Sequence, residues 1–263
     1  MFKRGILGFL LALGLSMMAH TAQGAVIENS MVVTDVTPAQ FCVVWGTLEP
    51  STAWVEVFED AQATIPFAQA VVKAESPDHP PAENIGVMKV KVLGLKPDTE
   101  YFFRTQTTLK QTGAIYASPL HRVKTQKASA IVRNDVLVQK VSVGSGNEAP
   151  GVLVIASVDG ASYPVSGWVG DGVPGQYAAI DTNNFYHAQT RVNLELRGGE
   201  VIKLTVFGGS LGSFEIQETI PEETGEMQQL SRAVSFEVAK ASSGASGQAA
   251  GGGGGCFIAA IIE

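Results

Sequence analysis

One short segment has the spacing of a serine nucleophile. Residues 208–212 read Gly-Gly-Ser-Leu-Gly and match G-x-S-x-G, in which a strained strand-to-helix turn exposes the serine. That chemistry needs a following helix and, in the usual chain order, a downstream histidine to deprotonate the hydroxyl. After Ser210 the sequence is strand-like, and the last histidine, His187, lies upstream. We therefore interpret this segment as a glycine-rich hairpin turn.

Histidines and oxygen-bearing side chains could ligate metal ions. The histidines outside the N-terminal segment are His79, His121 and His187. They are far apart, and a zinc site needs clustered ligands such as H-E-x-x-H or a cysteine pair. Possible calcium ligands are Asp159, Asp171, Asp181, Asn183 and Asn184. Because an EF-hand glycine and distal glutamate are missing and such residues are common in turns, we expect no metal and no other cofactor.

A group of glutamates suggests glycosidase chemistry, in which two acids act across a sugar bond. Its members are Glu215, Glu218, Glu222, Glu223 and Glu226. The only aromatic residues near them are Phe214 and Phe236, whereas glycosidases place their acids among the aromatics of a cleft. The sequence favours a solvated acidic edge that discourages pairing between sheets. We predict that the chain is not an enzyme.

Aromatic residues are the remaining candidates for ligand binding. They are Tyr163, Trp168, Tyr177, Phe185 and Tyr186, and all fall between Ala161 and His187. Rings on a β-sandwich loop can stack on sugar faces or anchor a protein partner. The alternative is that these rings close a hydrophobic core.

The N-terminus has the features of a secretory signal. Lys3 and Arg4 precede an apolar run over residues 5–18, and small residues flank a cleavage point between Gly24 and Ala25. We expect residues 1–24 to be removed, which places the protein in the cell envelope or outside the cell. Removal leaves 16 Lys and Arg against 25 Asp and Glu, a net charge of −9. Such a chain repels nucleic acid and anionic membrane surfaces.

Residues 25–126 have the short alternating runs of an antiparallel sandwich. Phe41, Val43 and Trp45 alternate on one face of a predicted strand. The run Leu-x-Pro-x-Thr-x-Tyr over residues 95–101 predicts a turn followed by a strand, with the Tyr101 ring buried at the sandwich corner and its hydroxyl bonded to nearby backbone. Together with the closing strand over residues 120–125, this segment resembles a fibronectin type III domain. The resemblance implies a spacer, adhesive or accessory module without catalytic residues.

Residues 127–240 predict a second all-β domain, either a sandwich or barrel-like. The strands expected are 136–143, 151–158, 192–196, 201–207, 213–220 and 233–238. Glycine-containing turns separate them, and residues 222–233 could hold a turn or two of helix. The predicted fold class is thus all-β, an immunoglobulin-like (fibronectin type III) sandwich followed by a second β domain.

The C-terminus combines a flexible linker with a short motif. Residues 241–255 are rich in Gly, Ser and Ala, and residues 256–263 begin Cys-Phe-Ile-Ala. This junction resembles the CFI-box element of exported Gram-negative proteins and departs from it at Ala260. The resemblance implies sorting or surface retention, with Cys256 as a site of processing or attachment. The alternative is a frayed terminus with an unused cysteine.

These observations predict a non-catalytic exported protein acting in adhesion, scaffolding or partner binding, with a protein or glycan partner at the cell surface. Membrane association is expected only if the tail is anchored. Two alternatives stay open: an accessory or degenerate member of an extracellular hydrolase family, and a subunit of a surface filament.

Overall fold

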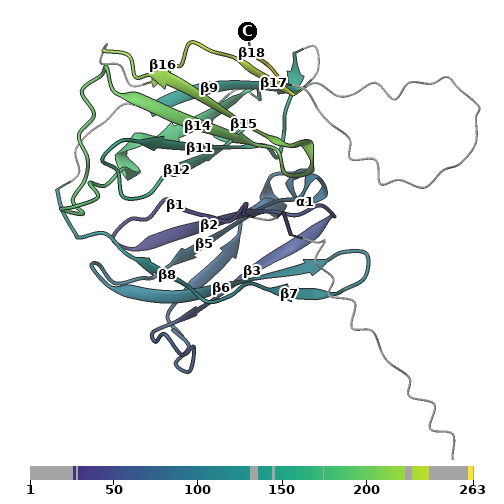
Figure 1. The fold of residues 1–263 in the computed structure, drawn as a ribbon, viewed down its shortest axis with the longest axis vertical. Coiled ribbons are helices and arrows are strands. Elements are labelled where there is room, and N and C mark those ends of the chain that lie inside the picture. The colour runs from purple at the N-terminus through teal and green to yellow at the C-terminus, as the bar shows by residue number, and fades with distance from the viewer. Residues whose placement is uncertain are drawn as a thin grey trace, which may run out of the picture.

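A computed structural model describes residues 26–27, 29–130, 136–143, 146–173, 175–222 and 227–236, and the backbone of 260–262. The chain is almost entirely β, and its sheets form two sandwiches stacked one on the other (Figure 1). Within the described ranges, no helix combines the length and apolar character that crossing a membrane requires.

The first sandwich consists of antiparallel sheets. One sheet has the order β1 (Val32–Thr34), β2 (Gln40–Gly46), β5 (Val87–Leu93) and β4 (Val71–Ala74). The other has the order β3 (Ser51–Phe58), β6 (Glu100–Leu109) and β7 (Ile115–Ala117), with β8 (His121–Lys124) also paired to β6. This is the strand order of an immunoglobulin constant-type sandwich, with β7 and β8 sharing the place of the last strand. The predicted immunoglobulin-like fold is confirmed.

The core of the first sandwich follows the predicted alternation. Phe41, Val43 and Trp45 on β2 are buried against Phe103 of the facing sheet. The indole N–H of Trp45 donates to the Thr107 hydroxyl at 2.9 Å, which satisfies a polar group inside the core. Tyr101 is buried at the start of β6. Its hydroxyl accepts a hydrogen bond from the Lys96 N–H at 3.0 Å, forming the expected corner.

The second sandwich packs two further sheets around a core of aliphatic residues. In one sheet the order is β12 (Val165–Trp168), β11 (Leu153–Val158), β14 (Val201–Phe207) and β15 (Ser213–Thr219). The other is built on β9 (Val136–Val143), which pairs with β10 (Asn147–Glu148), β13 (Tyr177–Asp181), β16 (Met227–Gln229) and β17 (Val234–Phe236). Strands β16 and β17 run parallel to β9, and β18 (Ala260–Ile262) pairs with β17. The prediction of a second all-β domain is confirmed.

Some element predictions in this half are wrong. Residues 192–196 form no strand, and the β-bridge between Asn193 and Tyr186 is an isolated one. Of residues 222–233, which could hold a turn or two of helix, Met227–Gln229 form the strand β16, and 223–226 lie outside the described residues. Short helices occur elsewhere: η1 (Ser76–Asp78), α1 (Ala82–Ile85), η2 (Thr182–Asn184) and η3 (Gly209–Leu211).

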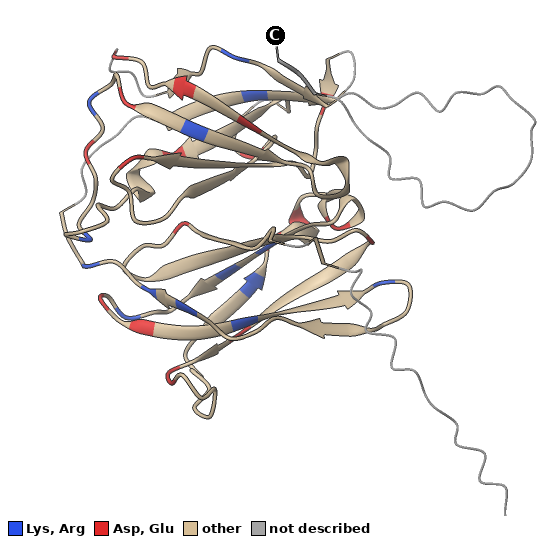
Figure 2. Ribbon diagram, viewed as in Figure 1, with Lys and Arg blue, Asp and Glu red and all other residues tan. Residues whose placement is uncertain are grey.

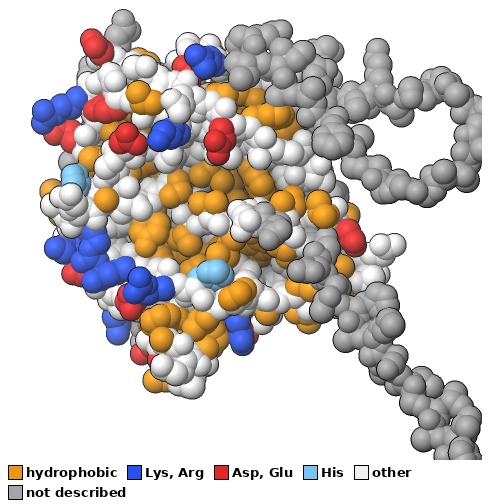
Figure 3. Space-filling model, in the orientation of Figure 1, with side chains coloured by type: hydrophobic (Ala, Val, Ile, Leu, Met, Phe, Trp, Pro, Cys, Tyr) orange, Lys and Arg blue, Asp and Glu red, His pale blue; other side chains and the backbone are white. Residues whose placement is uncertain are grey.

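The sheet containing β2 packs its outer face on the sheet containing β11, so the sandwiches meet over a shared apolar cluster. The cluster consists of Val44, Ala82, Val87, Leu153, Ile155, Trp168 and Phe207. The contact is tightly packed, because a Cβ added at Gly46 would lie 2.8 Å from the Phe207 ring. Hydrophobic side chains also gather at the surface over this junction (Figure 3). Strand β2 is therefore buried on both faces.

Candidate binding site between the two sandwiches

Charged side chains enter the junction from β5. Met88, Val90 and Val92 point into the first core, so the alternation of the strand directs Lys89 and Lys91 toward the second sandwich. The basic residues of this strand are blue in Figure 2. The Lys89 side chain is only 6% exposed. A buried ammonium is costly unless carboxylates compensate it.

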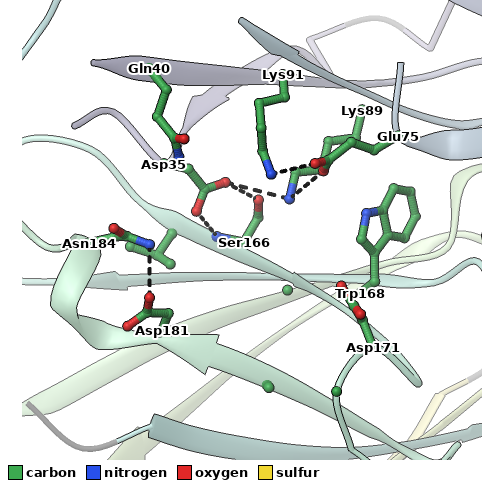
Figure 4. A pocket seen from close by; sticks show the side chains of 14 residues that line it. Asp35, Gln40, Glu75, Lys89, Lys91, Ser166, Trp168, Asp171, Asp181 and Asn184 are labelled. Atoms are coloured by element: carbon green, nitrogen blue, oxygen red, sulfur yellow. Dashed lines mark hydrogen bonds and ion pairs between the residues drawn. The ribbon is translucent and has the colours of Figure 1, made fainter. Parts of the chain in front are cut away.

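Glu75 provides much of this compensation. It follows β4 directly, and its N–H donates to the Lys89 carbonyl at 2.8 Å, which holds its side chain beside the lysines. Its carboxylate lies 3.2 Å from Lys89 Nζ and 2.5 Å from Lys91 Nζ (Figure 4). Burial by itself raises the pKa of Glu75, but the two ammonium groups outweigh it and hold that pKa below its ordinary value.

Asp35 joins the cluster to the second sandwich. Its carboxylate lies 3.7 Å from Lys89 Nζ and accepts hydrogen bonds from the N–H of Ser166 on β12, at 3.0 Å, and from the Ser166 hydroxyl. The Asp35 N–H donates to the Pro164 carbonyl at 2.9 Å. Burial lowers the pKa of Lys89, but the carboxylates of Asp35 and Glu75 raise it above its ordinary value. The cluster is thus a charged connection between the two domains.

A cavity of about 290 Å³ opens beside this cluster. Both sandwiches line this cavity. The first contributes Asp35, Gln40, Glu75, Lys89 and Lys91. The second contributes Ser166, Trp168, Asp171, Asp181 and Asn184. We call this cavity the junction pocket. Its two lysines face four carboxylates, which leaves an excess of two negative charges. A pocket of this kind favours neutral or cationic ligands.

Trp168 forms one wall of the junction pocket. The His79 ring stacks on it, with ring centroids 4.5 Å apart, and Lys89 Nζ lies 6.0 Å from the indole centroid. Burial lowers the pKa of His79, so this ring is neutral near pH 7. Trp168 Nε1 is buried and has no acceptor among the described residues.

Cys42 lies on the outer face of β2, toward the second sandwich, and is completely buried. Burial raises the pKa of its thiol. Since the thiolate is the nucleophilic form, the group is unreactive in this position.

The structure separates the five aromatic residues proposed to bind a ligand. Trp168 lines the junction pocket, whereas Phe185 and Tyr186 are buried in the second sandwich. Tyr163 packs against the core of the first sandwich, and Tyr177 is half-buried on β13. Sequence reasoning missed Lys89, Glu75 and Asp35, which form the charged wall of the pocket.

Contacts within the fold explain the positions of several other candidate residues. Ser210 lies in η3, between β14 and β15, and a strand follows it, as a hairpin turn requires. Asp181 caps η2 by accepting from the Asn183 N–H at 3.1 Å. His79 is half-buried, and its ring stacks on Trp168. Across the described ranges, no group of three or more His, Cys, Asp or Glu side chains is placed to hold a metal ion.

The prediction that the glutamates form a solvated acidic edge is wrong for Glu218. This side chain is buried, accepting hydrogen bonds from the Ser231 hydroxyl at 2.7 Å and the Arg232 N–H at 3.0 Å. Glu215 and Glu222 are exposed, and Glu223 and Glu226 lie outside the described residues.

The predicted processing sites at the ends of the chain also lie outside the described residues. These are the cleavage point between Gly24 and Ala25, and Cys256 in the tail.

No protein-family model matches the chain, and no curated protein does. Among solved structures, purple acid phosphatase PPD1 from yellow lupin (Lupinus luteus) seeds is 16% identical over 46% of this chain and 23% of its own, with a TM-score of 0.28. The chicken CNTN1 FN1–FN3 domains are 13% identical over 80% of this chain and 70% of theirs, with a TM-score of 0.26. The titin domains z1z2, solved in complex with telethonin, are 11% identical over 79% and 93%, with a TM-score of 0.21. None of these likenesses bears on function.

Proposed function

We propose that this chain is a non-catalytic exported protein of the cell envelope or extracellular space that binds a partner as one rigid body. The observation that carries the proposal is the shared interface. Apolar residues of β2, β5, β11 and β14 pack across it, and Asp35 is hydrogen-bonded to Ser166 on the other side. Domains that move relative to each other ordinarily meet through more polar interfaces. The apolar contact seen in this chain therefore favours a fixed arrangement of the two sandwiches.

The way polar groups are used supports binding over catalysis. Lys89 and Glu75 neutralise each other inside the junction, and the Cys42 thiol is sealed between the sandwiches. Ser210, the one serine in a nucleophile-like motif, lies in a hairpin turn. Lys89 and Glu75 thus stabilise the junction, and neither Cys42 nor Ser210 is placed as a nucleophile.

Two features of the sequence support export. Residues 1–24 have the pattern of a cleaved signal, and the tail with Cys256 resembles a CFI-box element. We infer an envelope or extracellular location, with a protein or glycan as the partner and Cys256 as the point at which the chain is processed or attached.

Cell fractionation tests this proposal. The full chain is expressed in a Gram-negative host, and the medium, outer membrane, periplasm and cytosol are probed with an antibody to the first sandwich. We expect a product that starts near Ala25 and lies outside the cytosol. A control variant with Leu11→Arg interrupts the apolar run and should stay inside. Wild-type protein that keeps its first 24 residues in the cytosol would overturn the proposal.

A further inference from the structure

The junction pocket has a neutral inner wall and a negative mouth. Lys89 and Lys91 are paired with Asp35 and Glu75, so these four groups cancel in charge. Asp171 and Asp181 lie on the other wall and are exposed. Within the described part of the chain, neither forms an ion pair with a lysine or arginine. A positively charged group entering the mouth therefore finds two uncompensated carboxylates.

The same pocket holds an unused hydrogen-bond donor. Trp168 is 2% exposed, and its indole N–H meets no acceptor among the described residues. The nitrogen is on the side of the ring that faces the charged cluster (Figure 4). A buried N–H without a partner is unfavourable, so an acceptor supplied by a ligand would stabilise it.

These two features select a ligand that carries both a cationic group and acceptor oxygens. A metal cation provides no acceptor for the indole, and an anion is repelled by Asp171 and Asp181. Gln40 and Asn184 add amides, which can donate and accept, as hydroxyl groups require. The volume of about 290 Å³ is near the lower limit of ligand pockets, roughly 300 Å³, so the ligand is small.

We propose that the junction pocket binds a short saccharide that carries free amino groups, with one ammonium at Asp171, another at Asp181 and a hydroxyl oxygen accepting from Trp168. This inference rests on the proposed binding function and specifies its partner as an amino-sugar glycan. The acidic chain, with its net charge of −7, attracts such a cationic glycan at long range.

The test compares two saccharides with the same β-1,4-linked backbone, one with free amines and one with acetylated, neutral nitrogens. The protein is titrated calorimetrically with the β-1,4-linked disaccharide of glucosamine and with its N-acetylated counterpart, in which the amines are neutral. We expect the amine form to bind at least about tenfold more tightly, because acetylation removes the two exposed ion pairs with Asp171 and Asp181. Equal affinities would contradict recognition of the amine.

Variants locate the site. Asp171→Asn and Asp181→Asn should each weaken binding about fivefold, and Trp168→Phe, which keeps a packed ring but removes the N–H, about tenfold. Asp159→Asn is the matched control, because this exposed carboxylate lies outside the pocket and pairs with Lys203. Circular dichroism establishes that each variant is folded.

The results of the two experiments distinguish failure of the amino-sugar proposal from failure of the export proposal. If the wild-type protein binds neither disaccharide at millimolar concentration, the amino-sugar proposal is wrong, although the fractionation result still stands on its own. Binding that survives Asp171→Asn and Asp181→Asn together would also overturn it. Cytosolic protein that nevertheless binds the amine form would overturn the export proposal alone.

Discussion

Replacing Lys89 with methionine tests the buried cluster most sharply. The lysine side chain is 6% exposed, and its ammonium lies 3.2 Å from Glu75 and 3.7 Å from Asp35. Methionine keeps the apolar stem but leaves Asp35 without a cation, whereas Glu75 retains Lys91. Breaking a buried pair in this way costs about 3–5 kcal/mol. Because one carboxylate keeps its partner, we expect a loss of about 3 kcal/mol in the free energy of unfolding at pH 7.

The loss should depend on pH. Lys89 and Lys91 outweigh burial and lower the pKa of Glu75 below its ordinary value of 4.5. A lowered carboxyl pKa adds stability that is fully present above the ordinary pKa and disappears as the pH falls through the folded-state pKa. The difference between wild type and Lys89→Met should therefore be largest near neutrality and should shrink below about pH 4.5.

Urea denaturation followed by circular dichroism measures this difference. The control is Lys203→Met, which removes an exposed ammonium paired with Asp159 and should change stability by less than about 0.5 kcal/mol. A Lys89→Met protein within about 0.5 kcal/mol of wild type at pH 7 would refute the conclusion that the cluster is buried and paired.

Three further substitutions test separate elements. Tyr101→Phe removes the hydroxyl that accepts from Lys96 and should lower the unfolding free energy by about 1 kcal/mol in a urea titration. Gly167→Ala would place a Cβ 2.0 Å from the Ala179 carbonyl oxygen, so a loss of about 2 kcal/mol is expected, and an unchanged thermal midpoint would contradict this packing. Ser210→Ala should leave both stability, within about 0.5 kcal/mol, and saccharide binding unchanged, as calorimetry can establish.

The first sandwich could be predicted because its signals are local. The alternation of Phe41, Val43 and Trp45 specifies one buried face of a strand. The turn before Tyr101 sets the corner within a few residues of sequence. Such patterns depend on neighbours along the chain, which a single sequence shows directly.

The junction pocket could not be predicted, because its parts are distant in sequence. Asp35 bonds to Ser166, 131 residues further along the chain. Lys89 lies between the core residues Met88 and Val90, the ordinary position of a solvent-facing lysine. Only the fold shows that this face is covered by a second sandwich.

The sequence contained one signal that the outer faces of β2 and β11 are covered. Residues 41–45 and 152–156 are uninterrupted apolar runs, and all of them are buried in the structure. Such runs are typical of strands buried on both faces. They indicate that β2 and β11 each have a covered outer face, without showing which sheet covers it.

We conclude that the two sandwiches form one body, closed over the outer face of β2. Cys42 lies on that face, so the rate of its modification by a thiol reagent measures how often the interface opens. A Cys256→Ser protein leaves Cys42 as the only cysteine. In native buffer Cys42 should react more than about a thousandfold more slowly than in the urea-unfolded chain. Labelling in native buffer at close to the unfolded rate would contradict the claim.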